Sequence, residues 1–351
     1  MSGGVDSSVS AALLKRAGHD VTGVFIKVWQ PDWIECNWRD ERRDAMRAAA
    51  HLEIPFVTLD LEREYKEGVI DYMIAEYAAG RTPNPDVMCN REVKFGAFWR
   101  WAKEQGADAI ATGHYARVGP SFELLAGVDA NKDQSYFLWT LNQADLPHVL
   151  FPVGHLIKSE VRALAAEFGL PNAEKKDSQG LCFIGKVDVK EFLGHYISAK
   201  PGAVINDAGN VIGIHPGALL FTMGERHGFT ITHKTPHDAP YYVIAKDVAA
   251  NTLTVSNTKL AQAGASHADS TSASSARLIR TNWCKAVPIV GDELSVRTRY
   301  RQPLMKARVS FVDAAAKTAT LDIETVTDPI TPGQSLVAYR GDACVGGGII
   351  V

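Results

Sequence analysis

The 351-residue chain has few cysteines, no long apolar run and almost no excess of charge of either sign. Its five cysteines are scattered and form no C-x-x-C pair, which argues against a disulfide framework or a zinc knuckle and favours a reducing compartment. No run of about 18 apolar residues occurs, so we expect no membrane-spanning helix. The first residues lack the basic and apolar regions of a signal peptide, and we expect a cytoplasmic protein.

Composition and length are those of an ordinary globular protein. Apolar residues make up 46% and charged residues 22% of the chain, which excludes a disordered chain, a coiled coil and a collagen-like fibre. At the usual size of a domain, this length corresponds to two or three domains.

The charge is distributed unevenly along the chain. A net charge of −3 argues against a general nucleic-acid binder. Between residues 277 and 308, however, eight basic side chains stand against two acidic ones. If residues 294–300 form a strand, Arg297 and Arg299 share one face with Arg301 and suit an RNA backbone. A solvated outer face is the alternative, because runs of charge are commonly exposed.

The first 170 residues alternate between strand and helix patterns. Three runs rich in β-branched and apolar residues predict buried strands: 21–29, 55–60 and 109–112. Four residues at helical spacing define one face of a helix: Phe95, Phe98, Trp99 and Ala102. This alternation predicts an α/β fold with a doubly wound parallel sheet, which binds ligands at the carboxyl ends of its strands.

The pattern changes after about residue 195. Glycine and proline become frequent and strands become short, and an Ala/Ser-rich stretch at 261–276 indicates a linker or surface loop. We therefore predict a catalytic α/β domain at 1–195, a small β-rich central domain at 196–260, and a C-terminal β-barrel or sandwich at 270–351.

The segment Ser2-Gly3-Gly4-Val5-Asp6-Ser7-Ser8 precedes an apolar helical pattern. Two glycines let backbone N–H groups approach an anion, the start of a helix favours negative charge, and two serines add hydroxyl donors. No G-K-[S/T] follows, so this is not a Walker A loop. A Gly-Gly turn before a helix is, by itself, most often only a turn.

Two cysteines lie in settings that favour reactivity. Cys89 follows Thr82-Pro83-Asn84-Pro85-Asp86, and with Asp86 as the N-cap it would be the third helical residue, where the helix dipole favours a thiolate. Cys182 lies between glycines and near lysines, which also suits a reactive thiol. Either could instead be a small buried core residue. Nothing in the surroundings of Cys36, Cys284 or Cys344 distinguishes them from packing or surface residues.

Nine segments together resemble one family, the bacterial tRNA-specific 2-thiouridylases (MnmA/TrmU) of the PP-loop ATP pyrophosphatase superfamily. They run from end to end of the chain: SGGVDSS (2–8), GRTPNPDVMCNREVKF (80–95), ATGHYAR (111–117), NKDQSYFL (131–138), FPVG (151–154), KKDSQGLCFIG (175–185), RTRYRQ (297–302), TPGQS (331–335) and CVGGGII (344–350). The segments PNPD…CN and DSxGxCFIG belong to this family rather than to PP-loop proteins at large.

Two features depart from the family pattern. The superfamily places the phosphate loop after a buried strand, whereas only Met1 precedes it here. The family commonly reads YTIGQRKG where this chain has FTMGERHG at 221–228. Glu225 and His227 remove an amide and a fixed positive charge near the expected RNA path, which bears on tRNA preference and not on the chemistry.

The resemblance implies an adenine-nucleotide-hydrolase-like sheet, a central β-rich domain and a C-terminal barrel, and ATP-dependent 2-thiolation of the wobble uridine at position 34 of tRNA. ATP, with Mg²⁺ but no dedicated metal site, would adenylate the C2 oxygen of the uridine. Cys182 would carry a persulfide that supplies the sulfur to C2, either by direct attack or after Cys89 releases it as hydrosulfide, and AMP and pyrophosphate would be released. Cys89 would be the nucleophile that forms a transient disulfide with Cys182, and Asp86 is the candidate acid or base.

The same resemblance assigns the binding residues. ATP would contact Met1, Ser2, Gly3, Gly4, Val5, Asp6, Ser7, Ser8, Ile26 and Gly113. The target base would face Asn84, Pro85 and Asp86. The tRNA would pass His114, Lys132, Asp133, Gln134, Arg299, Tyr300 and Gln334. The expected partners are tRNAs of the Lys, Glu and Gln type and a sulfur donor such as a cysteine desulfurase or sulfur-relay protein, and we expect a monomer.

Two other functions remain open at this point. A different PP-loop enzyme would deliver an amine to an adenylated carbonyl and would need no pair of cysteines. A non-catalytic RNA- or nucleotide-binding relative would keep the fold without turnover, and measured release of AMP and pyrophosphate would distinguish it.

Overall fold

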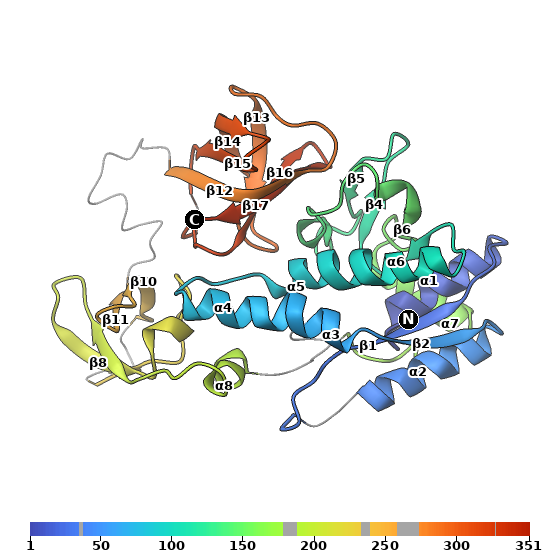
Figure 1. Cartoon of the computed structure of the whole chain (residues 1–351), viewed down its shortest axis with the longest axis horizontal. Helices are drawn as coiled ribbons and strands as arrows, with labels where there is room; N and C mark the ends of the chain where they lie inside the picture. Colours follow the sequence, from blue (N-terminus) through green and yellow to red (C-terminus); the bar gives the residue numbers. More distant parts are fainter. Residues whose placement is uncertain (35–37, 178–187, 233–238, 258–273, 327) are drawn as a thin grey trace.

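The computed structural model describes residues 1–34, 38–177, 188–232, 239–257, 274–326 and 328–351. It contains an α/β region, a central five-stranded sheet and a C-terminal barrel, which Figure 1 shows at the right, left and top. The predicted persulfide residue Cys182 lies outside the described residues, as does the Ala/Ser-rich stretch except for its last three residues.

The α/β region contains short parallel strands flanked by helices. Strand β1 (Gly23–Lys27) pairs with β2 (Phe56–Asp60), and β3 (Ile110–Ala111) pairs with β6 (Val149–Leu150), both in parallel. Their helical neighbours are α1 (Val5–Arg16), α2 (Trp38–His51) and α7 (Lys158–Glu167). The α/β class is confirmed and all three predicted strands are present, but the prediction that the strand at 55–60 is buried is wrong, because every residue of β2 is at least partly exposed. Among the described residues the parallel strands hydrogen-bond as two separate pairs.

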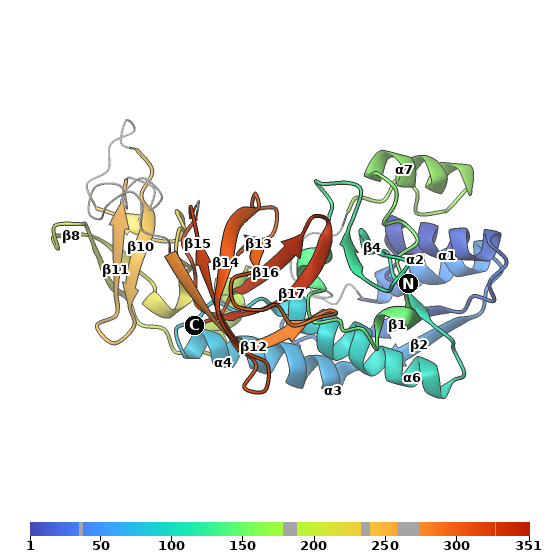
Figure 2. The ribbon, with the colours of Figure 1, turned by 90° about the horizontal axis from the view of Figure 1, so that it is seen from above.

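Two long helices lead from the α/β region toward the central sheet, beneath the barrel (Figures 1 and 2). The first comprises α3 (Glu62–Tyr65), the π-helical η1 (Lys66–Asp71) and α4 (Tyr72–Ala78). The second comprises α5 (Pro85–Met88), the π-helical η2 (Cys89–Ala97) and α6 (Phe98–Glu104). Phe95 and Ala102 are buried, and Phe98 and Trp99 pack against the same core, so the predicted apolar helix face is confirmed.

The central part is a small β structure that follows α8 (Val189–Gly194). Its strands lie in the order β10-β11-β7-β8-β9. Their bounds, with the 3₁₀ turn among them, are β7 (Gly202–Ile205), β8 (Val211–His215), η5 (Ala218–Leu220), β9 (Thr230–Ile231), β10 (Tyr242–Asp247) and β11 (Thr252–Ser256). The predicted change to short strands after about residue 195 is therefore present.

Six antiparallel strands close into the predicted barrel. They are β12 (Ser274–Trp283), β13 (Glu293–Arg297), β14 (Met305–Asp313), β15 (Thr318–Ile323), β16 (Ser335–Arg340) and β17 (Ala343–Ile350). Pairing of β12 with both β15 and β17 closes the ring, and inward residues such as Leu278 and Val296 fill its core. A hairpin of the α/β region, β4 (Ala116–Val118) and β5 (Leu124–Ala126), extends the barrel sheet beside β17.

A buried segment joins the α/β region to the barrel. It contains the 3₁₀ turn η3 (Ser135–Phe137) and precedes a second one, η4 (Leu146–His148). The Tyr136 hydroxyl lies 3.1 Å from the Thr298 carbonyl and 2.9 Å from the Ser335 carbonyl. Trp139 Nε1 donates to Ser335 Oγ at 3.1 Å. These polar groups satisfy one another where the two regions pack together.

Replacement of Tyr136 by Phe tests this junction. The Tyr136→Phe variant leaves buried carbonyls without their hydroxyl partner, so we expect a loss of about 1–3 kcal/mol of unfolding free energy. Urea unfolding followed by tryptophan fluorescence measures the change. Tyr196→Phe, at a residue that is 38% exposed, is the control and should unfold at the wild-type midpoint. Equal midpoints for all three proteins would show that the Tyr136 bonds do not stabilise the junction.

Candidate active site

The predicted phosphate loop forms a tight turn in front of α1. Gly4 is the N-cap, with φ −84° and ψ 161°, and the helix begins at Val5. The hydroxyls of Ser7 and Ser8 donate to the Gly4 carbonyl at 3.0 and 3.1 Å. Because the first N–H groups of a helix lack intrahelical acceptors, the turn places donors where a phosphate can bind.

Residues distant in the sequence hold this turn in place. Asn172 is 7% exposed and donates from Nδ2 to the Gly3 carbonyl at 2.9 Å and to Ser8 Oγ at 3.0 Å. Gly113 packs so closely that a Cβ atom there would lie 2.8 Å from backbone atoms of Asp6 and Ser7. A larger residue at position 113 would therefore displace the predicted phosphate loop.

The other predicted nucleotide contacts lie next to the loop. Ile26 is the penultimate residue of β1 and packs against the main core. The Met1 amino group donates to the Val24 carbonyl, so β1 directly adjoins the start of the loop.

A lysine at the start of α7 reaches the phosphate loop. Lys158 Nζ lies 2.6 Å from Asp6 Oδ1 and 2.9 Å from Asp177 Oδ1, and the side chain is 16% exposed. The Tyr115 hydroxyl donates to the same Asp6 oxygen at 2.9 Å. The structure thus holds an ammonium group beside the turn, where it can neutralise phosphate charge.

Three cations surround Asp177. Lys132, Lys158 and Arg162 lie 2.7, 2.9 and 2.8 Å from its carboxylate oxygens. Burial raises the pKa of Asp177, but hydrogen bonds from Lys132 and Lys158 outweigh it and lower that pKa to about 2. Asp177 is therefore ionised at neutral pH and gathers positive charge near the phosphate loop.

His114 is buried and neutral. Its Nδ1 lies 2.7 Å from Thr112 Oγ1, and its ring centroid lies 5.9 Å from that of Phe95. Burial and the nearby Lys94 ammonium lower the pKa of His114 well below its usual value. At neutral pH its imidazole can therefore donate or accept hydrogen bonds, but it carries no positive charge that would attract RNA.

The helix that carries Cys89 begins earlier than predicted. Asn84, not Asp86, is the N-cap, and its Oδ1 accepts a bond from the Val87 N–H. The prediction of Asp86 as the cap is therefore wrong, because Pro85 at the first helical position already fixes a helical backbone. Cys89 is the fifth helical residue and 0% exposed, so it lies beyond the first turn, where the dipole acts most strongly.

The three predicted arginines do not share a strand face. Strand β13 ends at Arg297, and a turn follows in which Gln302 Oε1 accepts bonds from the Thr298 and Arg299 N–H groups. Arg297 is directed inward, 3.5 Å from the buried Asp133, and Arg301 lies over the Tyr300 ring. The strand prediction for residues 298–300 is wrong because a local side-chain bond favours the turn.

Three further residues predicted to contact tRNA interact with other parts of the protein. Arg299 Nη2 donates to the Met223 carbonyl at 2.7 Å, and the Tyr300 ring centroid lies 4.6 Å from that of Phe137. Asp133 accepts bonds from the backbone of Gly127 and Ser135.

One sequence departure is accommodated locally. Glu225, where the family commonly has Gln, lies 2.6 Å from Lys190 Nζ and accepts the Thr222 N–H at 3.0 Å. Its negative charge is therefore paired with a lysine of α8, the helix that precedes the central sheet.

A series of contacts connects the phosphate loop to the Cys89 helix. The Tyr115 hydroxyl donates to Asp6, and the Tyr115 N–H donates to Gln134 Oε1 at 3.0 Å. Three residues further on, the Phe137 carbonyl accepts a bond from Asn90 Nδ2 at 3.0 Å. Asn90 is the neighbour of Cys89, so the two candidate reaction centres share one supporting segment.

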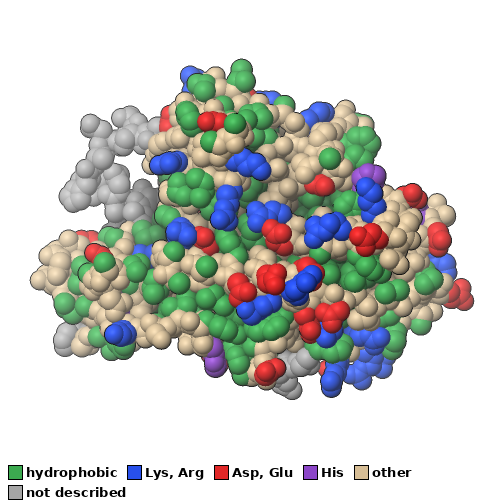
Figure 3. Space-filling view, in the orientation of Figure 1, with side chains coloured by type: hydrophobic (Ala, Val, Ile, Leu, Met, Phe, Trp, Pro, Cys, Tyr) green, Lys and Arg blue, Asp and Glu red, His purple; other side chains and the backbone are tan. Residues whose placement is uncertain are grey.

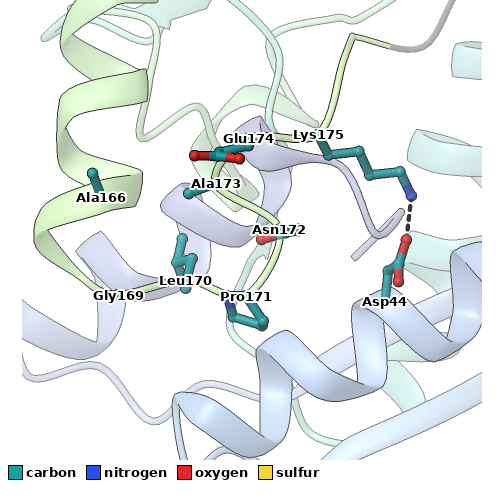
Figure 4. Close-up of a pocket in the computed structure, with 9 residues that line it drawn as sticks. All are labelled: Asp44, Ala166, Gly169, Leu170, Pro171, Asn172, Ala173, Glu174 and Lys175. Carbon is teal, nitrogen blue, oxygen red and sulfur yellow. Dashed lines mark hydrogen bonds and ion pairs between the residues drawn. The ribbon is translucent and has the colours of Figure 1, made fainter.

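A cavity of about 560 Å³ lies behind the phosphate loop (Figure 4). The loop 169–175 and the α2 residue Asp44 line it, and Lys175 Nζ binds Asp44 at 2.7 Å across it. Asn172 lines this cavity and also hydrogen-bonds the phosphate loop.

The surface of the molecule carries charges of both signs. The face in Figure 3 shows lysines and arginines interspersed with carboxylates across the middle of the molecule.

Sequence analysis missed Lys158, Asn172 and Tyr115. Lys158 lies shortly after the FPVG segment, at the start of a helical pattern. This position could have suggested Lys158 as a phosphate-binding residue. Nothing in the sequence marks Asn172, because its partner atoms belong to residues more than 160 positions away.

Within the described ranges, no three histidine, cysteine or acidic side chains gather as a metal site would require. None of the helices described has the length and apolar character needed to cross a bilayer.

Three family models match consecutive parts of the chain. They describe a tRNA methyl transferase HUP domain at residues 1–186, a tRNA methyl transferase PRC-barrel domain at 190–257 and an aminomethyltransferase beta-barrel domain at 274–350. The order of an α/β domain, a central β domain and a barrel agrees with the structure.

Curated relatives match the whole chain. Proteins named tRNA-specific 2-thiouridylase MnmA from Stenotrophomonas maltophilia, Leptothrix cholodnii and Geobacillus thermodenitrificans are 46%, 45% and 43% identical to it. Each alignment covers 100% of this chain and 92%, 94% and 93% of the respective relative.

Removal of the Lys158 ammonium tests the nucleotide site. We expect Lys158→Gln to weaken ATP binding about tenfold or more, because one charge-assisted bond to phosphate is lost. Equilibrium binding of a fluorescent ATP analogue measures this effect. Lys285→Gln removes a lysine that pairs with Glu123 on an exposed surface and should bind as wild type does. Unchanged affinity in Lys158→Gln would exclude Lys158 from the nucleotide site.

Proposed function

The chain belongs to the tRNA-specific 2-thiouridylase family, and on this premise we propose how its residues carry out the reaction. It is a tRNA sulfurtransferase that forms 2-thiouridine with the use of ATP. We propose that the target is the wobble uridine, position 34, in tRNAs of the Lys, Glu and Gln type. A uridine stacked in a helix hides its C2 position, so an unstacked anticodon base is a suitable target.

Three regions divide the work in this proposal. Residues 1–195 bind ATP and carry the reaction, residues 196–260 form the central domain, and the barrel at 270–351 contacts the tRNA. The chain works as a monomer in the cytoplasm and receives sulfur from a cysteine desulfurase or a sulfur-relay protein.

ATP binds at the phosphate loop in this proposal. The turn from Met1 to Ser8 holds the phosphates at the start of α1, Gly113 lies beside the nucleotide and Ile26 on its adenine side. Lys158 adds a positive charge next to Asp6. Mg²⁺ would arrive bound to the polyphosphate and neutralise part of its charge.

The target base lies at Asn84, Pro85 and Asp86, with Asp86 as the acid or base. Along the tRNA path lie His114, Lys132, Asp133, Gln134, Arg299, Tyr300 and Gln334. His114 and Asp133 are buried, so in this proposal they hold neighbouring residues in position for tRNA and do not contact it themselves.

The sulfur chemistry needs two cysteines. The uridine C2 oxygen attacks the α-phosphorus of ATP, which forms an O-adenylated base and releases pyrophosphate. The terminal sulfur of a Cys182 persulfide attacks C2 and AMP leaves with the oxygen, so that the base is joined to Cys182 through an S–S bond. The Cys89 thiolate then attacks Cys182 Sγ, breaks that S–S bond and releases the 2-thiouridine. This leaves a Cys89–Cys182 disulfide, which an external thiol reduces.

The observation that carries this proposal is the series of contacts from Asp6 through Tyr115 and Gln134 to the helix of Cys89. It supports a shared site, because ATP activation and sulfur transfer act on the same C2 position of one base.

Transfer of ³⁵S from labelled cysteine to tRNA, with ATP, Mg²⁺ and a desulfurase, tests the proposal. We expect label at the wobble uridine with wild type and a loss of at least about a hundredfold with Cys89→Ser or Cys182→Ser, because each removes a reacting sulfur. Release of AMP and pyrophosphate is measured in the same reactions.

Cys344→Ser is the control at a cysteine without an assigned role and should retain transfer. Label that survives in both Cys89→Ser and Cys182→Ser would exclude the persulfide mechanism. Absence of AMP release in wild type would instead contradict adenylation itself.

A further inference from the structure

The backbone of Thr82, two residues before Asn84, is held from the barrel. The Thr82 N–H donates to the Pro332 carbonyl at 2.9 Å. Gln334 Nε2 donates to the Thr82 carbonyl at 3.0 Å and to the Pro83 carbonyl at 3.2 Å. The N–H and the carbonyl of Thr82 are thus both bound by a loop some 250 positions later in the chain. Thr82 is only 5% exposed, so these backbone groups depend on the barrel for their partners.

Gly333 permits this close approach. Its φ of +92° lies in the region that side chains with a Cβ rarely adopt. A Cβ atom at this position would lie 2.8 Å from the N, C and O atoms of Thr82. The barrel loop and the Thr82 backbone therefore fit only while residue 333 is glycine.

A further contact fixes the same segment from the central domain. Thr82 Oγ1 lies 3.2 Å from Thr222 Oγ1 of the central domain. All three regions of the chain therefore meet at the segment that precedes the Cys89 helix.

We propose that the barrel loop Thr331–Ser335 is a clamp that positions the Thr82–Asp86 loop for the reaction, with Gln334 and Gly333 as positioning residues. This inference rests on the proposed function, because it gives the barrel a part in forming the target-base site in addition to holding tRNA. Gln334 acts through the loop: both hydrogens of its amide group are directed to Thr82 and Pro83. A displacement of a reacting group by about 1 Å can cost about a hundredfold in rate.

Gln334→Met tests the clamp, since methionine has a similar length, no donors and no charge that would repel RNA. Single-turnover ³⁵S transfer is measured at saturating tRNA, and tRNA affinity is measured separately by filter binding. We expect the rate to fall at least about tenfold while the dissociation constant for tRNA stays within about twofold. Gly333→Ala, which pushes the Thr82 backbone away, should show the same separation of rate from affinity.

Gln143→Met is the matched control, because Gln143 also donates from Nε2 to a backbone carbonyl, that of Ser121, away from the loop. It should retain the wild-type rate. Thermal unfolding of every variant shows which variants are folded. If Gly333→Ala does not fold, the rate and tRNA affinity of Gln334→Met alone test the clamp.

Weaker tRNA binding with an unchanged rate at saturation would overturn the clamp and make Gln334 a direct RNA contact. A wild-type rate and affinity in Gln334→Met would also overturn it. Failure of wild type to thiolate tRNA would instead contradict the proposed function, so the two failures are distinguishable.

Discussion

The architecture depends on the satisfaction of buried polar groups along residues 133–139, where the α/β region meets the barrel. Tyr136, Trp139 and Ser135 all bond to barrel atoms, and Ser135 Oγ reaches Tyr339 OH at 3.1 Å. Separation of the regions would exchange these bonds for bonds to water, at a net cost of about 0.5–1.5 kcal/mol for each bond. Water can replace part of these bonds only after the apolar surface around Tyr136 and Trp139 is exposed. The barrel therefore packs as one folded unit with the α/β region.

The same segment determines how the two halves of the candidate site relate. Gln134 binds Tyr115, whose hydroxyl binds Asp6 of the phosphate loop, and the Phe137 carbonyl binds Asn90 beside Cys89. A rigid segment that contacts both elements limits their relative motion. In the proposed reaction ATP activates the C2 oxygen and sulfur attacks C2 of the same base, so such a restriction would keep the two steps in register.

Local features of the sequence were predictable, and contacts between distant residues were not. The strands at 21–29 and 55–60 and the apolar helix face at Phe95 follow from periodicities within short windows, and the structure contains them. The turn after Arg297 escaped the prediction because alternation of charged residues also occurs outside strands, and the Gln302 amide decides the geometry. Lys158 binds Asp6 across 152 positions, and no pattern within a window can show such a pair. Motif strings indicated the candidate site, whereas the contacts that support its residues could be found only in the fold.

Charge at the nucleotide site follows from these long-range contacts. Lys132, Lys158 and Arg162 surround the carboxylates of Asp6 and Asp177, so three cations face two anions beside the phosphate loop. The carboxylates keep the side chains of the cations ordered when no polyphosphate is present, which reduces the entropy that binding would otherwise cost. The remaining positive charge favours an anion at the start of α1, in the same direction as the helix dipole. Hydrogen bonds from Lys132 and Lys158 lower the pKa of Asp177 to about 2, so Asp177 is ionised at neutral pH and keeps these cations in place. A neutral His114 nearby adds no charge, so the attraction for phosphate comes from the lysines, the arginine and the backbone of the loop.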